Sequence, residues 1–204
     1  MGIVCFTFAV FLYGSVSLAF TEKCSLPIPQ EDPDISKMTD TVWYLGVQTN
    51  DPVAADVTCV RVYNITKSSA GFNAATDEFG AGSDRTDFIS HFTRQSLGVY
   101  HENNEDEPSL EAAHEHTLEG KFNAEARKMD DEILLKDDNV FLTDYANYLT
   151  VMQCPAEGKW IILNYFKQPQ PSLDSVIKFY NKLHELGVSA RFHASRCNEK
   201  DFTE

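Results

Sequence analysis

Two histidines of this chain are spaced so that they could act together in chemistry or in ligand binding. His114 and His116 alternate within residues 113–119, so in a strand both side chains would point to one face. The other face of this segment carries two glutamates and a threonine, which suit solvent better, so we expect the histidines to face inward. Such a pair could ligate a metal or a haem iron, or hydrogen-bond a polar ligand. The alternative is a solvated rim beside an acidic loop, and a pattern of two residues does not decide between them.

Motifs of known catalytic mechanisms are missing from the sequence. It has no H-E-x-x-H zinc motif, no G-x-S-x-G nucleophile elbow and no phosphate-binding loop. No two cysteines are close enough in sequence for a structural zinc site. We therefore expect a protein that is not an enzyme and that has neither catalytic residues nor a metal site.

The first residues indicate export from the cell. Residues 3–13 form an uncharged apolar run, and Ser17 and Ala19 occupy the small-residue positions that precede a cleavage site. We expect residues 1–19 to be a signal peptide and residues 20–204 to be a single domain of a secreted, extracellular protein. An N-x-T sequon at Asn64 predicts N-glycosylation, which agrees with export.

Four cysteines remain once Cys5 is removed with that segment. An even number in an exported chain predicts two disulfides, because the secretory pathway is oxidising. Three pairings are possible, and the residues alone do not choose among them. The four are Cys24, Cys59, Cys154 and Cys197.

The charge of the chain excludes some classes of partner. Its 204 residues carry a formal net charge of −14. Such a surface repels nucleic acid and anionic lipid, because both are polyanions. No later stretch is apolar enough to span a bilayer, so we expect no transmembrane segment. A monomer or a homodimer is compatible with these properties.

The hydrophobic pattern is that of short strands followed by one helix. A helix is expected from an N-cap at Ser172 to a C-cap at Gly187, followed by a short strand at 188–193. Residues 102–111 are predicted to be an acidic, solvated loop. The predicted fold is all-β: an eight-stranded antiparallel up-and-down β-barrel with one C-terminal α-helix packed outside, against residues 160–166. The segments with a strand pattern number nine, which we interpret as about eight strands: 43–47, 57–63, 71–76, 87–94, 114–122, 132–136, 140–143, 148–154 and 160–166.

Three short motifs resemble those of the lipocalin family. Trp43 resembles the tryptophan of the family's G-x-W motif, although Thr41 replaces the glycine, and Lys167 stands where the family has an arginine. The mature chain is most similar to arthropod lipocalins such as apolipoprotein D-like carriers, bilin-binding proteins and nitrophorins. The T-D-Y-x-x-Y motif is present in full, as Thr143, Asp144, Tyr145 and Tyr148.

The resemblance implies several structural roles. In the family, the tryptophan plugs the closed end of the barrel and the basic residue packs across it, so Trp43 and Lys167 should stack. Lysine lacks the planar guanidinium and should stack less well than arginine. The implied disulfides are Cys24–Cys154 and Cys59–Cys197.

Alternation along the strands predicts which residues line the barrel. Trp43 should point inward, so Leu45 and Val47 share its face. Cys59 and Cys154 tether outer segments, so their sequence neighbours should point inward. The remaining expected lining residues are Val60, Val62, Phe88, Phe92, Leu149 and Val151, together with His114 and His116.

A mostly apolar lining favours binding and transport of a small hydrophobic ligand, such as a lipid, sterol, retinoid or tetrapyrrole. No cofactor is expected, although haem or a bilin would suit the resemblance. One alternative is an extracellular scavenger of haem or of biogenic amines, and acidic residues facing the cavity would favour the amine. Another is an inhibitor that binds a protein partner through the loops at the barrel mouth.

Overall fold

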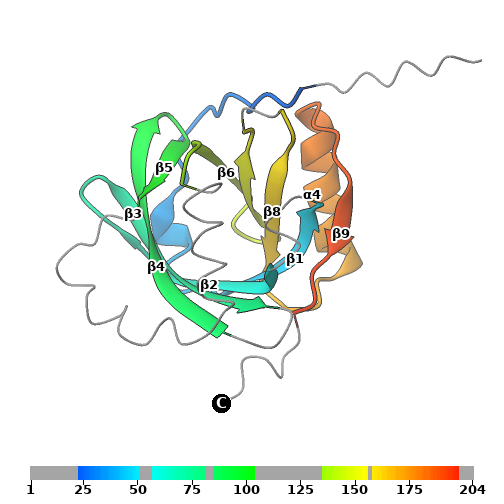
Figure 1. Ribbon diagram of the computed structural model, residues 1–204, viewed down its shortest axis with the longest axis horizontal. Coiled ribbons are helices and arrows are strands. Elements are labelled where there is room, and N and C mark those ends of the chain that lie inside the picture. The colour runs from blue at the N-terminus through cyan, green and yellow to red at the C-terminus, as the bar shows by residue number, and fades with distance from the viewer. Residues whose placement is uncertain (1–22, 51–56, 81–84, 104–134, 156–157, 198–204) are drawn as a thin grey trace, which may run out of the picture.

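The computed structural model describes residues 23–50, 57–80, 85–103, 135–155 and 158–197, which form one closed antiparallel barrel with a helix beside it (Figure 1). Eight strands make the barrel, and a ninth short strand extends it, which confirms the predicted fold. The helices are η1 (Ile35–Lys37) and α4 (Leu173–Glu185). The strands are β1 (Trp43–Thr49), β2 (Val57–Lys67), β3 (Gly71–Gly80), β4 (Arg85–Ser96), β5 (Val99–Asn103), β6 (Asn139–Thr143), β7 (Leu149–Gln153), β8 (Ile161–Phe166) and β9 (Phe192–Ala194).

Two differences from the predicted strands concern β5 and its surroundings. The strand β5 includes residues 102–103, which the acidic composition had assigned to a solvated loop. Residues 135–136, expected at the end of a strand, form a turn. The strand expected at 114–122 lies outside the described residues. Among the described residues, no helix has both the length and the apolar character that a membrane crossing requires.

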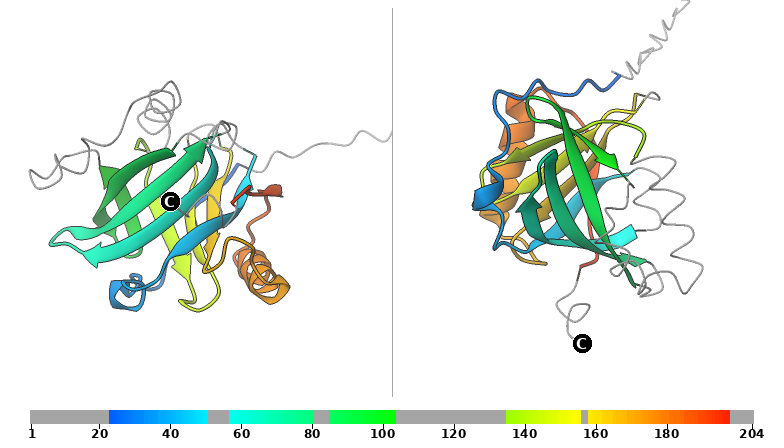
Figure 2. Two further views of the ribbon diagram at one scale, coloured as in Figure 1. Left: turned by 90° about the horizontal axis from the view of Figure 1, so that it is seen from below. Right: turned by 90° about the vertical axis from the view of Figure 1, so that its left-hand side faces the viewer.

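Strand β1 closes the barrel because it has partners on both of its edges. Residues 44–48 pair with β8 on one edge, and residues 43–44 pair with β2 on the other. From residue 47 onward, β9 replaces β2 on that second edge. The two views in Figure 2 show the resulting cup, with α4 lying against its outer wall.

A β-bulge in β1 reverses which residues point inward. Leu45 is opposite Tyr165 and Val47 is opposite Asn164, so two steps along β1 match one step along β8. Beyond the bulge, Val47 therefore packs in the apolar cluster that includes the helix, and Gln48 takes the inward position.

Helix α4 covers the outer face of the sheet next to β8. The side chain of Ser172 caps the helix by accepting a hydrogen bond from the amide of Ser175 at 3.2 Å. Phe179 and Leu183 are buried one turn apart and pack on the sheet. Gly187 ends the helix with a φ of +69°, a conformation that glycine adopts without strain. The helix and its N-cap at Ser172 are confirmed, whereas the C-cap is Leu186, one residue before the predicted Gly187.

The residues of the T-D-Y-x-x-Y motif build the turn between β6 and β7. The hydroxyl of Thr143 accepts a hydrogen bond from the amide of Tyr145 at 2.9 Å. The carboxylate of Asp144 accepts from the amides of residues 146–148 at 2.7–3.2 Å. Burial opposes ionisation of Asp144, but these hydrogen bonds outweigh it and lower its pKa. The Tyr145 hydroxyl accepts from the amide of Asp34 at 2.8 Å and so fastens the N-terminal arm.

One end of the barrel is closed by a tryptophan and a lysine. The Trp43 side chain is fully buried, and the Nζ atom of Lys167 lies 5.5 Å from the centre of its ring. This is the arrangement implied by the resemblance, with a point charge in place of a stacked guanidinium.

The two disulfides attach the ends of the described chain to the barrel wall. Cys24–Cys154 holds the N-terminal arm beside the end of β7, and Cys59–Cys197 holds the segment after β9 on β2. Both pairs are those that the resemblance implied.

The bulge and the adjacent ring give a first testable prediction. A methyl group on Gly46 would overlap the ring of Phe166, which is buried beneath the helix. We expect Gly46→Ala to lower the free energy of unfolding by about 1–3 kcal/mol, as overpacking usually does. Urea denaturation measures this change.

The same substitution in a variant that lacks the Phe166 ring tests whether the ring causes the loss of stability. In Phe166→Leu, the smaller side chain leaves room, so the added methyl group should cost less. The same cost in both backgrounds would show that the ring is not the reason.

Candidate ligand-binding cavity

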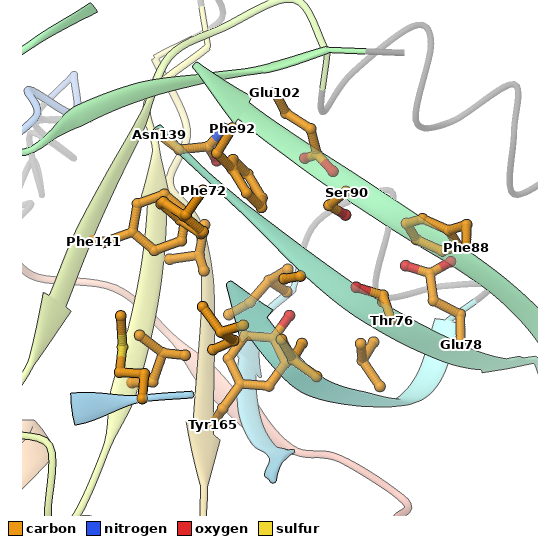
Figure 3. Close-up of a pocket in the computed structure, with 18 residues that line it drawn as sticks. Phe72, Thr76, Glu78, Phe88, Ser90, Phe92, Glu102, Asn139, Phe141 and Tyr165 are labelled. Carbon is orange, nitrogen blue, oxygen red and sulfur yellow. The ribbon is translucent and has the colours of Figure 1, made fainter. Parts of the chain in front are cut away.

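The barrel encloses a cavity of about 70 Å³ (Figure 3). Its walls are the inward faces of β2 to β8, and its floor includes Met38, which follows helix η1. Most of the lining is apolar, because alternate residues of each strand turn their side chains inward. The cavity is therefore a product of strand alternation in a closed sheet.

Six of the residues predicted from alternation line this cavity. They come from β2, β4 and β7, whose inward positions follow the two-residue period without interruption where they meet the cavity. The six are Val60, Val62, Phe88, Phe92, Leu149 and Val151.

Four predicted residues are not among the lining. Leu45 is buried in the interior cluster near the closed end and does not reach the cavity. Val47 points to the helix side because of the bulge in β1. His114 and His116 lie outside the described residues, so their inward orientation remains a prediction.

Aromatic rings form one wall of the cavity. The Phe72 ring stacks on Phe92 with centroids 4.8 Å apart, and Phe141 meets both rings edge-on at 5.1 Å. Tyr100 packs against the same group, 5.1 Å from Phe72. Rings in these arrangements are held in place by one another, so this wall is preformed.

Two glutamates that the sequence analysis overlooked point into the cavity. Glu78 on β3 and Glu102 on β5 both line it, and Figure 3 shows both carboxyl groups turned toward its interior. Glu78 is 5% exposed, and its Oε2 atom has no hydrogen-bond partner among the described residues. Glu102 is partly buried and is hydrogen-bonded to the hydroxyl of Ser90. Alternation from Phe72 along β3 would have identified Glu78, had the strand been extended to Gly80.

The surroundings of both carboxyl groups favour their neutral forms. Burial raises the pKa of Glu78 to about 8, and the nearby charge of Glu102 adds to the effect. Burial also raises the pKa of Glu102 to about 7, against the hydrogen bond from Ser90 and the charge of His101. The pKa of the Tyr165 hydroxyl in the same cavity is raised, first by burial and then by the two glutamates.

A second unpaired polar group lies across the cavity. The Nδ2 atom of Asn139 is buried and has no hydrogen-bond partner in the described part of the chain. Asn139 lines the same cavity as Glu78. Buried polar groups are normally paired, so an unpaired acceptor and an unpaired donor facing one cavity suit an occupant with polar groups of its own.

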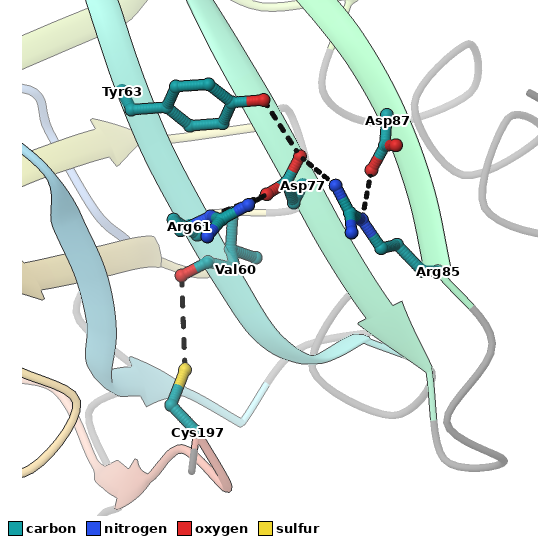
Figure 4. Close-up of polar contacts among 7 residues, drawn as sticks. All are labelled: Val60, Arg61, Tyr63, Asp77, Arg85, Asp87 and Cys197. Atoms are coloured by element: carbon teal, nitrogen blue, oxygen red, sulfur yellow. Dashed lines mark hydrogen bonds and ion pairs between the residues drawn. The ribbon is translucent and has the colours of Figure 1, made fainter. Parts of the chain in front are cut away.

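On the outer face of the same strands, the acidic residue Asp77 lies between two arginines (Figure 4). Asp77, next to Glu78, is fully buried on the outward face of β3. Its carboxylate accepts hydrogen bonds from Arg61 Nε at 2.5 Å and from the Tyr63 hydroxyl at 3.2 Å. Arg85 Nη2 lies 3.5 Å from the same carboxylate. The outward carboxylate is therefore paired with two arginines of the protein itself, although burial still raises its pKa.

Comparisons with known proteins identify the architecture. No model of a protein family matches the sequence, and no curated protein does. Among solved structures, lobster apocrustacyanin A1 is 14% identical, with a TM-score of 0.54 over 86% of this chain and 92% of that chain. Apocrustacyanin C2 gives the same values, and the cockroach allergen Per a 4 is 10% identical, with a TM-score of 0.56 over 85% and 94% of the two chains. At this level of identity, the likeness shows the fold alone.

The raised pKa values predict how stability depends on pH. In the unfolded chain Glu78 ionises near its ordinary pKa of 4.5, whereas in the folded protein it holds its proton up to about 8. Between these values the folded state binds more protons, so the free energy of unfolding should fall as the pH rises, by about 1.4 kcal/mol for each unit of pKa shift. Chemical denaturation between pH 5 and pH 8 measures the slope.

The variant Glu78→Gln removes the ionisable group and keeps its shape. Its stability should fall less steeply over this range, and it should be more stable than the wild type at the alkaline end. A slope unchanged by the substitution would contradict the burial of an ionisable group at this position.

Proposed function

We propose that this protein, which has the lipocalin fold, is a secreted carrier that binds a small, largely apolar molecule inside its barrel. The observation that carries the proposal is the cavity inside the barrel, with apolar walls and two buried polar atoms, Glu78 Oε2 and Asn139 Nδ2, that have no hydrogen-bond partner in the ranges the structure describes. Burial of a ligand's apolar surface there supplies roughly 25 cal/mol per Å². The few polar groups fix its orientation, as in most small-molecule sites.

The size of the cavity narrows the choice of ligand. Its volume of about 70 Å³ is small beside the roughly 300–1,000 Å³ of common ligand pockets. A guest of one ring and a short side chain suits this space better than a sterol, retinoid or tetrapyrrole does. No described histidine lines the cavity, so no observation favours the haem alternative.

Secretion is part of the proposal. The two disulfides suit an oxidising compartment, and the apolar run at residues 3–13 has the pattern of a signal peptide. Asn64 of the glycosylation sequon is exposed on β2, where a glycan could be attached.

Two leucine substitutions on neighbouring residues of β3 test whether ligands bind in the barrel. Ala74 lines the cavity, whereas Ala75 is on the opposite face of the strand. The wild type should bind at least some single-ring compounds from a panel of neutral and cationic molecules. Ala74→Leu should weaken binding at least about tenfold by filling the cavity, and Ala75→Leu should leave it unchanged.

Calorimetric or NMR titration measures these affinities, and circular dichroism checks that both variants are folded. Binding that is equal in the two variants would place the ligand elsewhere. A wild type that binds no member of the panel would contradict the proposed function.

A further inference from the structure

A second pocket lies outside the barrel, beneath the N-terminal strap. We use this name for residues 25–38, which begin at the Cys24–Cys154 disulfide and end at the floor of the barrel cavity. The pocket has a volume of about 280 Å³, against about 70 Å³ for the barrel cavity. One wall is residues 27–33 of the strap, and the opposite wall includes Thr143, Tyr145, Tyr148, Lys182 and Leu186.

Polar contacts hold the N-terminal strap in place over this pocket. Oδ1 of Asp32 accepts hydrogen bonds from the amide of Gly98 at 2.7 Å and from Arg94 Nε at 3.0 Å. The Tyr100 hydroxyl donates to the same atom at 3.4 Å. Pro29 packs so closely on Gly98 that a Cβ atom there would overlap it. The strap is thus attached to the turn between β4 and β5, and the pocket is built into the fold.

Phe141 on β6 lies between the two spaces. Among the described residues, it is the only one that lines both the barrel cavity and the pocket beneath the strap. The strand register explains its position, because Val99 is opposite Val140 and the next pair along brings Gly98 beside Phe141. Since Pro29 packs on Gly98, the Phe141 ring lies at the end of the barrel that the strap crosses.

Three other rings fix the orientation of the Phe141 ring. Its centroid lies 5.1 Å from that of Phe72, 5.1 Å from that of Phe92 and 5.7 Å from that of Tyr100, each in an edge-to-face arrangement. Figure 3 shows this ring beside Phe72 at one side of the barrel cavity. Edge-to-face contacts stabilise such a cluster beyond the burial of its surface, so moving the ring aside costs free energy.

We propose, resting on the binding function above, that Phe141 is a specificity-determining residue that limits the length of the ligand. Its ring separates the barrel cavity from the pocket beneath the strap, so the wild type selects a short molecule of about one ring. A molecule with a long apolar tail would have to displace the Phe141 ring and lose its three aromatic contacts. Without this ring, the tail would reach the larger pocket, where prolines and tyrosines offer apolar surface.

A series of phenols with straight alkyl chains of one to eight carbons, opposite the hydroxyl, tests the proposal. Each methylene group that leaves water should raise the affinity about fourfold. In the wild type, the affinity should rise over the first members and then fall at least about tenfold for the longest, because the chain no longer fits. Calorimetric titration measures these affinities.

A matched pair of variants identifies the residue responsible. Phe141→Ala should let the affinity keep rising with chain length, because the tail passes into the second pocket. Phe92→Ala removes an equal ring from the same wall, but Phe92 does not line that pocket, so the decline should persist after a small shift. In Phe141→Ala alone, the chain end should show nuclear Overhauser contacts with Tyr145 and Leu186, which a purely structural role of the ring would not produce.

Milder substitutions keep the test valid if the alanine variants do not fold. Phe141→Leu retains part of the packing and should move the decline to longer chains than Phe92→Leu does. Circular dichroism checks the fold of each variant.

The outcomes separate this proposal from the one on which it rests. If the affinity of the wild type rises along the whole series, its cavity does not limit chain length and the Phe141 proposal is wrong. If the decline occurs at the same chain length in the Phe92 and Phe141 variants, the proposal is also wrong, although the barrel still binds ligands. If neither a phenol nor any other member of the panel binds to the wild type, the proposed function itself fails.

Discussion

The closed barrel depends on a single strand that must form backbone hydrogen bonds with neighbours on both of its edges. Strand β1 is bonded to β8 along one edge and shares the other between β2 and β9. The bulge lies where β9 begins to replace β2, which lets the chain change partner without leaving the sheet. The amide of Ser195 donates to the carbonyl of Gly46 at 2.9 Å, and the disulfide of Cys197 fixes the same segment to β2. Closure at this seam is what makes the inward faces of the other strands into one enclosed wall.

Because the barrel is closed, burial of each inward side chain changes the stability of the fold. Phe72, Phe92 and Phe141 gain by mutual packing and by leaving water. Glu78 and Glu102 lose hydration and form no ion pair with a residue that the structure describes, so their burial opposes folding at neutral pH. Residues that cost stability in the folded chain are expected where ligand binding recovers the cost. The outward acid on the same strand, Asp77, contacts two arginines, although burial still raises its pKa.

The sequence predicted those parts of the fold that follow from short-range patterns. Alternation placed Val60, Phe88 and Val151 correctly, because no bulge interrupts their strands near the cavity. It placed Val47 on the wrong face, because a bulge between Leu45 and Val47 shifts the two-residue period. The glycine between them does not by itself predict a bulge. The run of acids after residue 101 indicated a loop, and Glu102 became part of a strand because pairing with β4 overrides composition.

Features built from contacts between residues close in sequence could be predicted, whereas features built from contacts between distant residues could not. The turn after Thr143 is built from hydrogen bonds within six residues, so its sequence motif and its structure coincide. The polar site has no such motif, because β4 separates Glu78 from Glu102 and the strand register alone brings both into one cavity: Glu78 lies opposite Val60, and Glu102 opposite Phe92. A change of one residue in either register would turn the carboxyl group outward to solvent. The binding site is therefore encoded in the pairing of strands, which a reading of consecutive residues does not contain.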